Sequence, residues 1–210
     1  MHPIKTGLGC AASLALMSVS TQAWPASAPM AAPDFAAVQP GGYAVEPTHT
    51  RILFSLSHLG FTTWYGDFSH ASGAATIDPA HPSASSVEVS VPVASIETTN
   101  TVLDEELKGA DWFDAAKFPT LTFKSRQISA TGPDEGEIVG DLTLHGVTRP
   151  VTLHVKFHGA GANPMSHAYT AGFDATGVIK RGDFGVTKYL PMVGDDVTLI
   201  ISAAFERKGP

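Results

Sequence analysis

The chain has 210 residues, of which 43% are hydrophobic, and its formal net charge at pH 7 is −7. This length predicts one domain with a short extension, and the hydrophobic fraction is normal for a globular protein with a buried core. The acidic balance, without any cluster of Lys and Arg, argues against nucleic-acid binding. The single cysteine, Cys10, excludes a disulfide framework.

The N-terminal segment has the layout of a secretory signal peptide. Lys5 precedes an uncharged apolar run, residues 8–19, and small residues suit cleavage after residue 23 or 28. That run is shorter than the roughly 20 residues that cross a bilayer, so we expect export to the periplasm without stable membrane insertion. Cys10 lies inside the run rather than after it, which argues against a lipoprotein acceptor site. We therefore predict a signal peptide over residues 1–23, an Ala/Pro-rich flexible leader over residues 24–41 and a folded domain over residues 42–210.

The folded domain alternates apolar and polar residues with a period of two, which indicates strands that bury one face. In residues 151–157, for example, valine, leucine and phenylalanine alternate with threonine, histidine and lysine. Short turns, such as the tight hairpin expected around residues 145–148, imply antiparallel order, because parallel neighbours need long crossovers. We expect eight or nine strands, at residues 52–58, 62–69, 74–78, 87–93, 121–123, 138–145, 151–157, 169–179 and 197–205.

One long connection breaks this rhythm. Thr101 and Asp104 resemble a capping box, and Leu107 lies on the apolar face of the helix that would follow. We predict a helix over residues 101–108 that ends at Gly109. A helical connection inside an all-β pattern suits a lid or plug over one end of a barrel.

Strands with one apolar face form either a sandwich or a closed barrel, and the alternation alone does not choose between them. About eight strands close into a barrel whose interior is either filled by side chains or holds one small ligand. Aromatic residues are dense in two groups, residues 61–68 and residues 112–113. They fit a plain hydrophobic core, but apolar and aromatic walls are also what ligand pockets present.

Several short motifs occur in order between residues 43 and 206. In this order and spacing they resemble the YceI family of bacterial secreted lipid-binding proteins, also called polyisoprenoid-binding domains. The motifs are Tyr43-x-x-Glu46-x-x-His49-Thr50, His58-Leu59-Gly60-Phe61, Gly66-Asp67-Phe68, Ser95-Ile96-Glu97-Thr98, Asp111-Trp112-Phe113-Asp114, Lys117-Phe118-Pro119, Gly140-Asp141-Leu142-Thr143-Leu144-His145-Gly146-Val147 and Arg181-Gly182-Asp183-Phe184-Gly185.

The resemblance implies an all-β, antiparallel, lipocalin-like barrel of about eight strands with one helix packed at an end. It also implies an elongated cavity for an isoprenoid, isoprenoid-quinone or fatty-acyl chain, with no other cofactor, and a periplasmic location. Family members often form dimers, and the sequence is compatible with a monomer or a homodimer. The residues that we expect to line the site are Phe54, His58, Phe61, Trp64, Phe68, Trp112, Phe113, Phe123, Leu142, Leu144, Phe173, Arg181 and Phe184.

Some positions depart from the family pattern. Residues 103–107 read Leu-Asp-Glu-Glu-Leu, where the family usually has Arg-Asp-x-His-Leu. Thr99 replaces a usual Gly, and Trp112 replaces a usual Phe. If the missing Arg and His contact a lipid headgroup in other members, the headgroup preference differs here. Arg181 beside an apolar cavity would anchor an anionic headgroup, and the alternative is a structural ion pair with Asp183 or with a neighbouring strand.

Motifs for catalysis or metal binding are weak. The sequence has no H-E-x-x-H motif, no G-x-S-x-G elbow and no phosphate-binding or dinucleotide-binding loop. His154 and His158 share a strand face but lie about 13 Å apart along it, so they cannot share one ion unaided. We therefore predict a lipid-binding protein or carrier, with no catalytic residues and no metal site. The alternatives are a lipid- or quinone-directed enzyme that uses the same cavity, and a filled barrel that acts as a stress or interaction protein.

Overall fold

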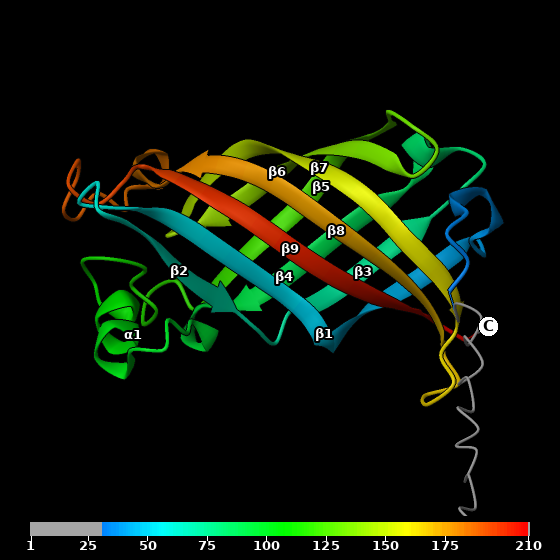
Figure 1. Cartoon of the computed structure of the whole chain (residues 1–210), viewed down its shortest axis with the longest axis horizontal. Coiled ribbons are helices and arrows are strands. Elements are labelled where there is room, and N and C mark those ends of the chain that lie inside the picture. The colour runs from blue at the N-terminus through cyan, green and yellow to red at the C-terminus, as the bar shows by residue number, and fades with distance from the viewer. Residues whose placement is uncertain (1–30, 210) are drawn as a thin grey trace, which may run out of the picture.

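The computed structural model describes residues 31–209, which form an antiparallel β-barrel with one α-helix at one end (Figure 1). Eight strands close the ring in the order β1, β3, β4, β5, β6, β7, β8 and β9, and β9 pairs back onto β1. The ninth strand, β2, pairs with the second half of β1. The bounds are Gly41–His58 (β1), Thr62–Phe68 (β2), Ser72–Ile77 (β3), Ser86–Pro92 (β4), Thr120–Ala130 (β5), Glu135–Leu144 (β6), Val147–Ala162 (β7), Tyr169–Lys180 (β8) and Asp196–Arg207 (β9).

The strands bury one face, as the period-two pattern predicts. On β9, Ile201 faces the barrel interior, whereas its neighbour Ile200 is 42% exposed. Closure gives each of the eight strands two partners, which removes most of the unpaired edge that would invite aggregation. The expected all-β, lipocalin-like barrel of about eight strands with one helix packed at an end is confirmed.

One edge of strand β1 pairs with two different strands. Residues 41–44 pair with β3 and residues 52–58 pair with β2, while the other edge pairs with β9. Between these stretches the register with β9 shifts, which marks a bulge after Glu46. At the bulge the Thr50 hydroxyl accepts a hydrogen bond from the Ala204 N–H at 3.1 Å, so a side chain replaces a bond of the ladder.

The helix α1 (Thr101–Lys108) lies in the long connection between β4 and β5 and has the expected bounds. Its N-cap is Asn100, whose side chain accepts hydrogen bonds from two backbone N–H groups of the first turn. The prediction of a capping box between Thr101 and Asp104 is therefore wrong, because the Asp104 side chain binds Thr98 instead. That carboxylate turns inward and accepts both the N–H and the hydroxyl of Thr98 at 2.7 Å. Within residues 31–209, no helix has the length and apolar character needed to cross a membrane.

Some strands extend further than the alternation predicts. β1 begins at Gly41, β5 continues to Ala130 and β7 continues to Ala162. The end of β7 passes through small residues, Gly159 to Gly161, which erase the contrast between apolar and polar faces. The turn between β6 and β7 has positive φ at both His145 (51°) and Gly146 (74°), as a two-residue hairpin turn requires.

Part of the expected leader lies against the barrel. Ala32 forms an antiparallel bridge with Ala160 of β7, and a short 3₁₀ turn, Phe35–Ala37, follows. Val38 is only 2% exposed. Ala32 and Val38 thus contact the barrel, whereas most other residues of 31–40 are exposed. The expected signal peptide and the first part of the leader, residues 1–30, lie outside the described residues.

Thr99 adopts φ = 64°, in the left-handed region where a β-branched residue is rare. We predict that Thr99→Gly raises the free energy of unfolding by roughly 0.5–1 kcal/mol. Relief of about 1–2 kcal/mol of left-handed strain is partly offset by the greater freedom of glycine in the unfolded chain. Urea denaturation measures the change. Thr99→Ala keeps the Cβ and should give no comparable gain, and a less stable glycine variant would contradict the strain argument.

The Glu46 carboxylate caps the β1 bulge. Burial raises its pKa, but hydrogen bonds from Thr48 and His49 outweigh this effect and lower the pKa to about 2. Since the ordinary value is 4.5, this carboxylate stabilises the fold above that pH, and the stabilisation is lost as the pH falls from 4.5 through 2. We predict that Glu46→Gln lowers the stability at neutral pH and flattens the loss of stability on acidification. The measurement is the free energy of unfolding as a function of pH. If it falls in parallel for variant and wild type, Glu46 does not stabilise the fold through its ionised form.

Candidate functional site: an apolar cavity inside the barrel

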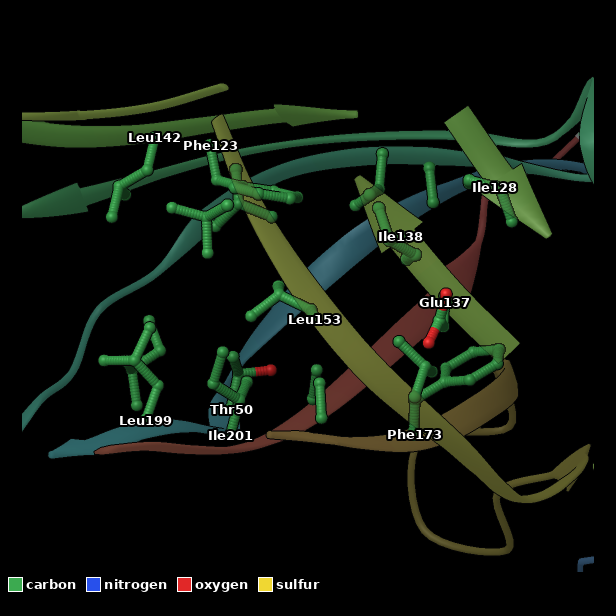
Figure 2. Close-up of a pocket in the computed structure, with 18 of the residues that line it drawn as sticks. Thr50, Phe123, Ile128, Glu137, Ile138, Leu142, Leu153, Phe173, Leu199 and Ile201 are labelled. Carbon is green, nitrogen blue, oxygen red and sulfur yellow. The ribbon is translucent and has the colours of Figure 1, made fainter. Parts of the chain in front are cut away.

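The barrel interior holds a cavity of ≈ 330 Å³. This volume falls within the range of small-molecule pockets in proteins. Its middle section is lined by aliphatic and aromatic side chains from β1, β5, β6, β7 and β9, as Figure 2 shows for Phe123, Leu142, Leu153, Leu199 and Ile201. The Thr50 hydroxyl, which also lies on this wall, is already hydrogen-bonded to the Ala204 backbone. The wall therefore offers apolar contact along the barrel axis.

The end beside α1 is closed. Leu107 of α1 and the following Trp112 reach the cavity, and both are buried. Phe113 packs edge-on against Phe68 of β2, with ring centroids 5.6 Å apart. Val186, from the connection between β8 and β9, completes this end and is 2% exposed. The long helical connection therefore closes one end of the barrel, as the sequence suggests for a lid or plug.

Arg181 lies at the closed end and is 4% exposed. Its Nε, Nη1 and Nη2 atoms donate to the carbonyl oxygens of Gly194, Val186 and Val193 at 2.8, 2.9 and 2.8 Å. The guanidinium also lies over the Trp112 ring, 5.4 Å from its centroid. Burial lowers the pKa of Arg181 from its ordinary value, and the charge of Asp195 opposes this effect.

The expected ion pair between Arg181 and Asp183 is not formed. Among the ion pairs of the described residues, none includes Arg181. Its three nitrogens instead hold together the two arms of the connection between β8 and β9. Because backbone carbonyls already use these donors, the arginine acts here as a structural clamp at the base of the cavity.

The opposite end of the cavity, which we call the mouth, reaches the surface. It is lined by Pro82, Ser85, Ser129, residues 132–134 of the turn between β5 and β6, and Glu135 at the start of β6. Pro133 and Glu135 are exposed, whereas Leu107, Trp112 and Val186 at the end beside α1 are buried. Phe35, from the segment before β1, also lines the cavity at this end. A ligand that enters the cavity along the barrel axis would therefore pass through the mouth.

Most of the residues expected from the sequence lie on the cavity wall. The structure places nine there: Phe54, Phe68, Trp112, Phe113, Phe123, Leu142, Leu144, Phe173 and Arg181. Whether they contact a ligand stays a prediction, because the structure contains none.

Four expected residues do not line the cavity. The rings of His58 and Trp64 contact each other at a tilt of 47°, with centroids 5.5 Å apart, in the part of the β1–β2 hairpin that continues beyond the pairing of β1 with β9. Phe61, at the tip of that hairpin, is 86% exposed. Phe184 is buried, but it packs beneath the β6–β7 turn, where its carbonyl oxygen contacts the His145 ring at 3.2 Å. A cluster of aromatic residues in the sequence can lie on the cavity wall or in a hairpin outside the closed ring, and the sequence pattern does not distinguish the two.

Other wall residues were not predicted from the sequence. The inward face of each strand could have identified the aliphatic ones, because alternation assigns the face. No signal identifies Phe35, a single aromatic residue in a Pro/Ala-rich segment. The missed residues include Phe35, Ile52, Leu56, Val87, Val89, Leu153, Phe157, Leu199, Ile201 and Phe205.

Two histidines of β7 pair with acidic residues. His154 pairs with Glu137, which is also among the residues that line the cavity, and His158 pairs with Asp174. Within residues 31–209, no group of three or more His, Cys, Asp or Glu side chains is arranged to hold a metal ion.

The clamp formed by Arg181 gives a stability prediction. Arg181→Met would leave three carbonyl oxygens without donors at the closed end, which should lower the free energy of unfolding by about 2–5 kcal/mol. Arg149→Met is the control, because Arg149 is exposed and makes only a 3.4 Å contact with the neighbouring carbonyl. That variant should change stability by less than about 0.5 kcal/mol. Equal effects in urea denaturation would show that Arg181 is not a clamp.

Comparisons with known proteins place this barrel in a family. A family model described as YceI-like domain matches residues 43–205. The UPF0312 protein of Ectopseudomonas mendocina is 39% identical over 162 residues, which cover 76% of this chain and 84% of the relative. Protein YceI of Escherichia coli is 41% identical over 157 residues, which cover 75% of this chain and 81% of the relative.

Solved structures share the architecture. BcnA of Burkholderia cenocepacia has a TM-score of 0.69 at 27% identity, covering 76% of this chain and 98% of that chain. A polyisoprenoid binding domain from Saccharophagus degradans has a TM-score of 0.58 at 15% identity, covering 81% of this chain and 100% of that chain, and this likeness shows the shared fold. Because the family model and both sequence relatives match most of the chain, the protein belongs to the YceI-like domain family.

Proposed function

We propose that the protein is a periplasmic binding protein or carrier for a long apolar lipid, held along the axis of the barrel. The ligand classes that fit are an isoprenoid, an isoprenoid quinone and a fatty-acyl chain. The observation that carries the proposal is the ≈ 330 Å³ cavity, closed beside α1, reaching the surface at the mouth and apolar between them. The signal-peptide pattern of residues 1–23 supports the periplasmic location.

The free energy available from such a wall is sufficient for tight binding. Each buried methylene is worth about 0.8 kcal/mol, so ten would contribute roughly 8 kcal/mol before the costs of association and ordering. A dissociation constant near 1 μM corresponds to about 8 kcal/mol. A wall of this kind recognises the length and shape of a chain more than its chemistry.

Charge placement favours a ligand with a neutral polar end. Among the described lining residues, Arg181 is the only basic one, and its guanidinium is bonded to carbonyl oxygens at the closed end. Asp134 and Glu135 lie at the mouth. An anionic headgroup held at the mouth would face charges of its own sign. We therefore expect an isoprenoid alcohol or quinone to bind more tightly than a fatty acid of similar length.

The cavity argues against the alternative of a barrel filled by side chains. Side chains that filled the interior would leave no volume of this size along the axis. The polyisoprenoid binding domain that shares the fold makes isoprenoids the first ligand class to test.

The proposal is tested by native mass spectrometry of the protein purified from its own periplasm, followed by solvent extraction. We expect a stoichiometric added mass that extracts as an isoprenoid or acyl chain. A bare protein mass, together with no thermal shift on addition of long-chain lipids, would contradict the proposal.

Adjacent isoleucines on β9 offer a matched test of where the ligand binds. Ile201→Trp places a larger ring in the cavity, whereas Ile200→Trp places the same ring on the outer face. We predict that Ile201→Trp weakens binding of all-trans-retinol, a neutral isoprenoid alcohol, by about tenfold or more, the effect of about 1.4 kcal/mol. Ile200→Trp should leave the affinity within about twofold. Retinol fluorescence gives the affinity, and equal weakening by both variants would place the ligand elsewhere.

A further inference from the structure

The segment before β1 crosses the mouth of the barrel. We call residues 31–40 the strap. In Figure 1 the strap, coloured blue, lies at the end of the barrel opposite α1. The strap ends where β1 begins, at Gly41. It lies outside residues 43–205, which match the family model, so the family resemblance says nothing of its role.

The strap binds to an edge that the barrel leaves open. β7 runs to Ala162, but its partner β6 begins at Glu135, which pairs with Lys156. The last six residues of β7 therefore extend past β6 on that edge. Ala32 pairs there with Ala160, through reciprocal backbone hydrogen bonds of 2.9 and 3.1 Å.

The strap places an aromatic ring on the cavity wall. The Asp34 carboxylate accepts the Ala36 N–H at 3.0 Å and thereby caps the 3₁₀ turn that presents Phe35. The Phe35 ring packs edge-on against Phe157 of β7 and Phe173 of β8, with centroids 5.4 and 6.4 Å away. Phe35 is partly buried and lines the cavity, so its ring borders the space that an occupant would fill.

Further contacts hold the strap, among them hydrogen bonds from the Gln39 N–H to the Tyr169 hydroxyl and from Arg207 to the Pro40 carbonyl. Val38 packs into the core with 2% of its surface exposed. The Tyr43 hydroxyl donates to the Gln39 carbonyl at 2.6 Å. The strap also fits closely over Gly159, where an added Cβ would lie 2.8 Å from the Ala31 Cβ and 3.2 Å from the Ala32 carbonyl oxygen. A side chain at position 159 would therefore displace the strap.

We propose that the strap is a working part of the ligand site: Phe35 contacts the end of the bound chain at the mouth, and the hold of the strap on β7 sets how slowly the ligand leaves. This inference rests on the proposed lipid-binding function. It adds a ligand-contacting residue that lies outside the family domain. It also makes release depend on a short segment bound by one bridge, three hydrogen bonds near its C-terminal end and a few apolar contacts.

The rate of ligand release tests the inference. The protein is loaded with all-trans-retinol and mixed with excess phosphatidylcholine vesicles, and the fluorescence decay gives the dissociation rate. We expect Phe35→Ala to raise the rate about tenfold, which corresponds to about 1.4 kcal/mol. Gly159→Ala, which disturbs the strap and leaves Phe35 in place, should raise it in the same direction.

Two matched control variants distinguish an effect on the strap from a general loss of stability. Gly172 pairs with Gly159 across β7 and β8, but an added Cβ there meets nothing closer than 3.8 Å. Phe61 is 86% exposed and does not line the cavity. Gly172→Ala and Phe61→Ala should therefore release retinol at the wild-type rate, and urea denaturation verifies that all four variants are folded.

The possible failures are distinguishable. If the wild type binds neither retinol nor other long-chain lipids, the proposed function fails. If the wild type binds retinol and both strap variants release it at the wild-type rate, the proposed function stands and the role of the strap is overturned. Faster release by the controls, to the same degree as by the strap variants, would also overturn it.

Discussion

The structure depends on one geometric constraint: a ring of eight strands encloses more space than its inward side chains fill. The strands must close because each has an apolar face to bury and an edge to pair. Closure then leaves ≈ 330 Å³ along the axis. An empty apolar cavity costs stability, on the order of 20–25 cal/mol per Å³. A bound chain would restore the missing contacts, so fold stability and ligand binding rest on the same unfilled volume.

The two ends of the barrel differ in how they are closed. Beside α1, buried residues such as Trp112 close the cavity, and Arg181 clamps the connection between β8 and β9 from within. At the mouth, turn residues reach the surface, and the strap contributes Phe35. Such a barrel has a fixed base and an access point held by weaker contacts. This arrangement fits a carrier, which must retain a chain and also release it.

The family resemblance predicted that the strands close into a barrel. Alternation predicted the strands themselves, because a strand has two faces and only one is buried. It failed where side chains are too small to show a face, as at the end of β7 around Gly159. Aromatic density was a poorer guide, since Trp64 and Phe61 belong to a hairpin that leaves the ring. Phe35 could not be predicted, because its place depends on the open edge of β7, a tertiary feature. The clamp of Arg181 likewise depends on carbonyl oxygens that only the folded connection brings together.

The most direct test of the account is a crystal structure of the protein purified without delipidation. We expect one elongated density along the barrel axis, running from Trp112 at the closed end to Phe35 at the mouth. Its polar end should lie at the mouth. A collapsed interior without density, or a lipid bound only on the outer face of the barrel, would contradict the central claim.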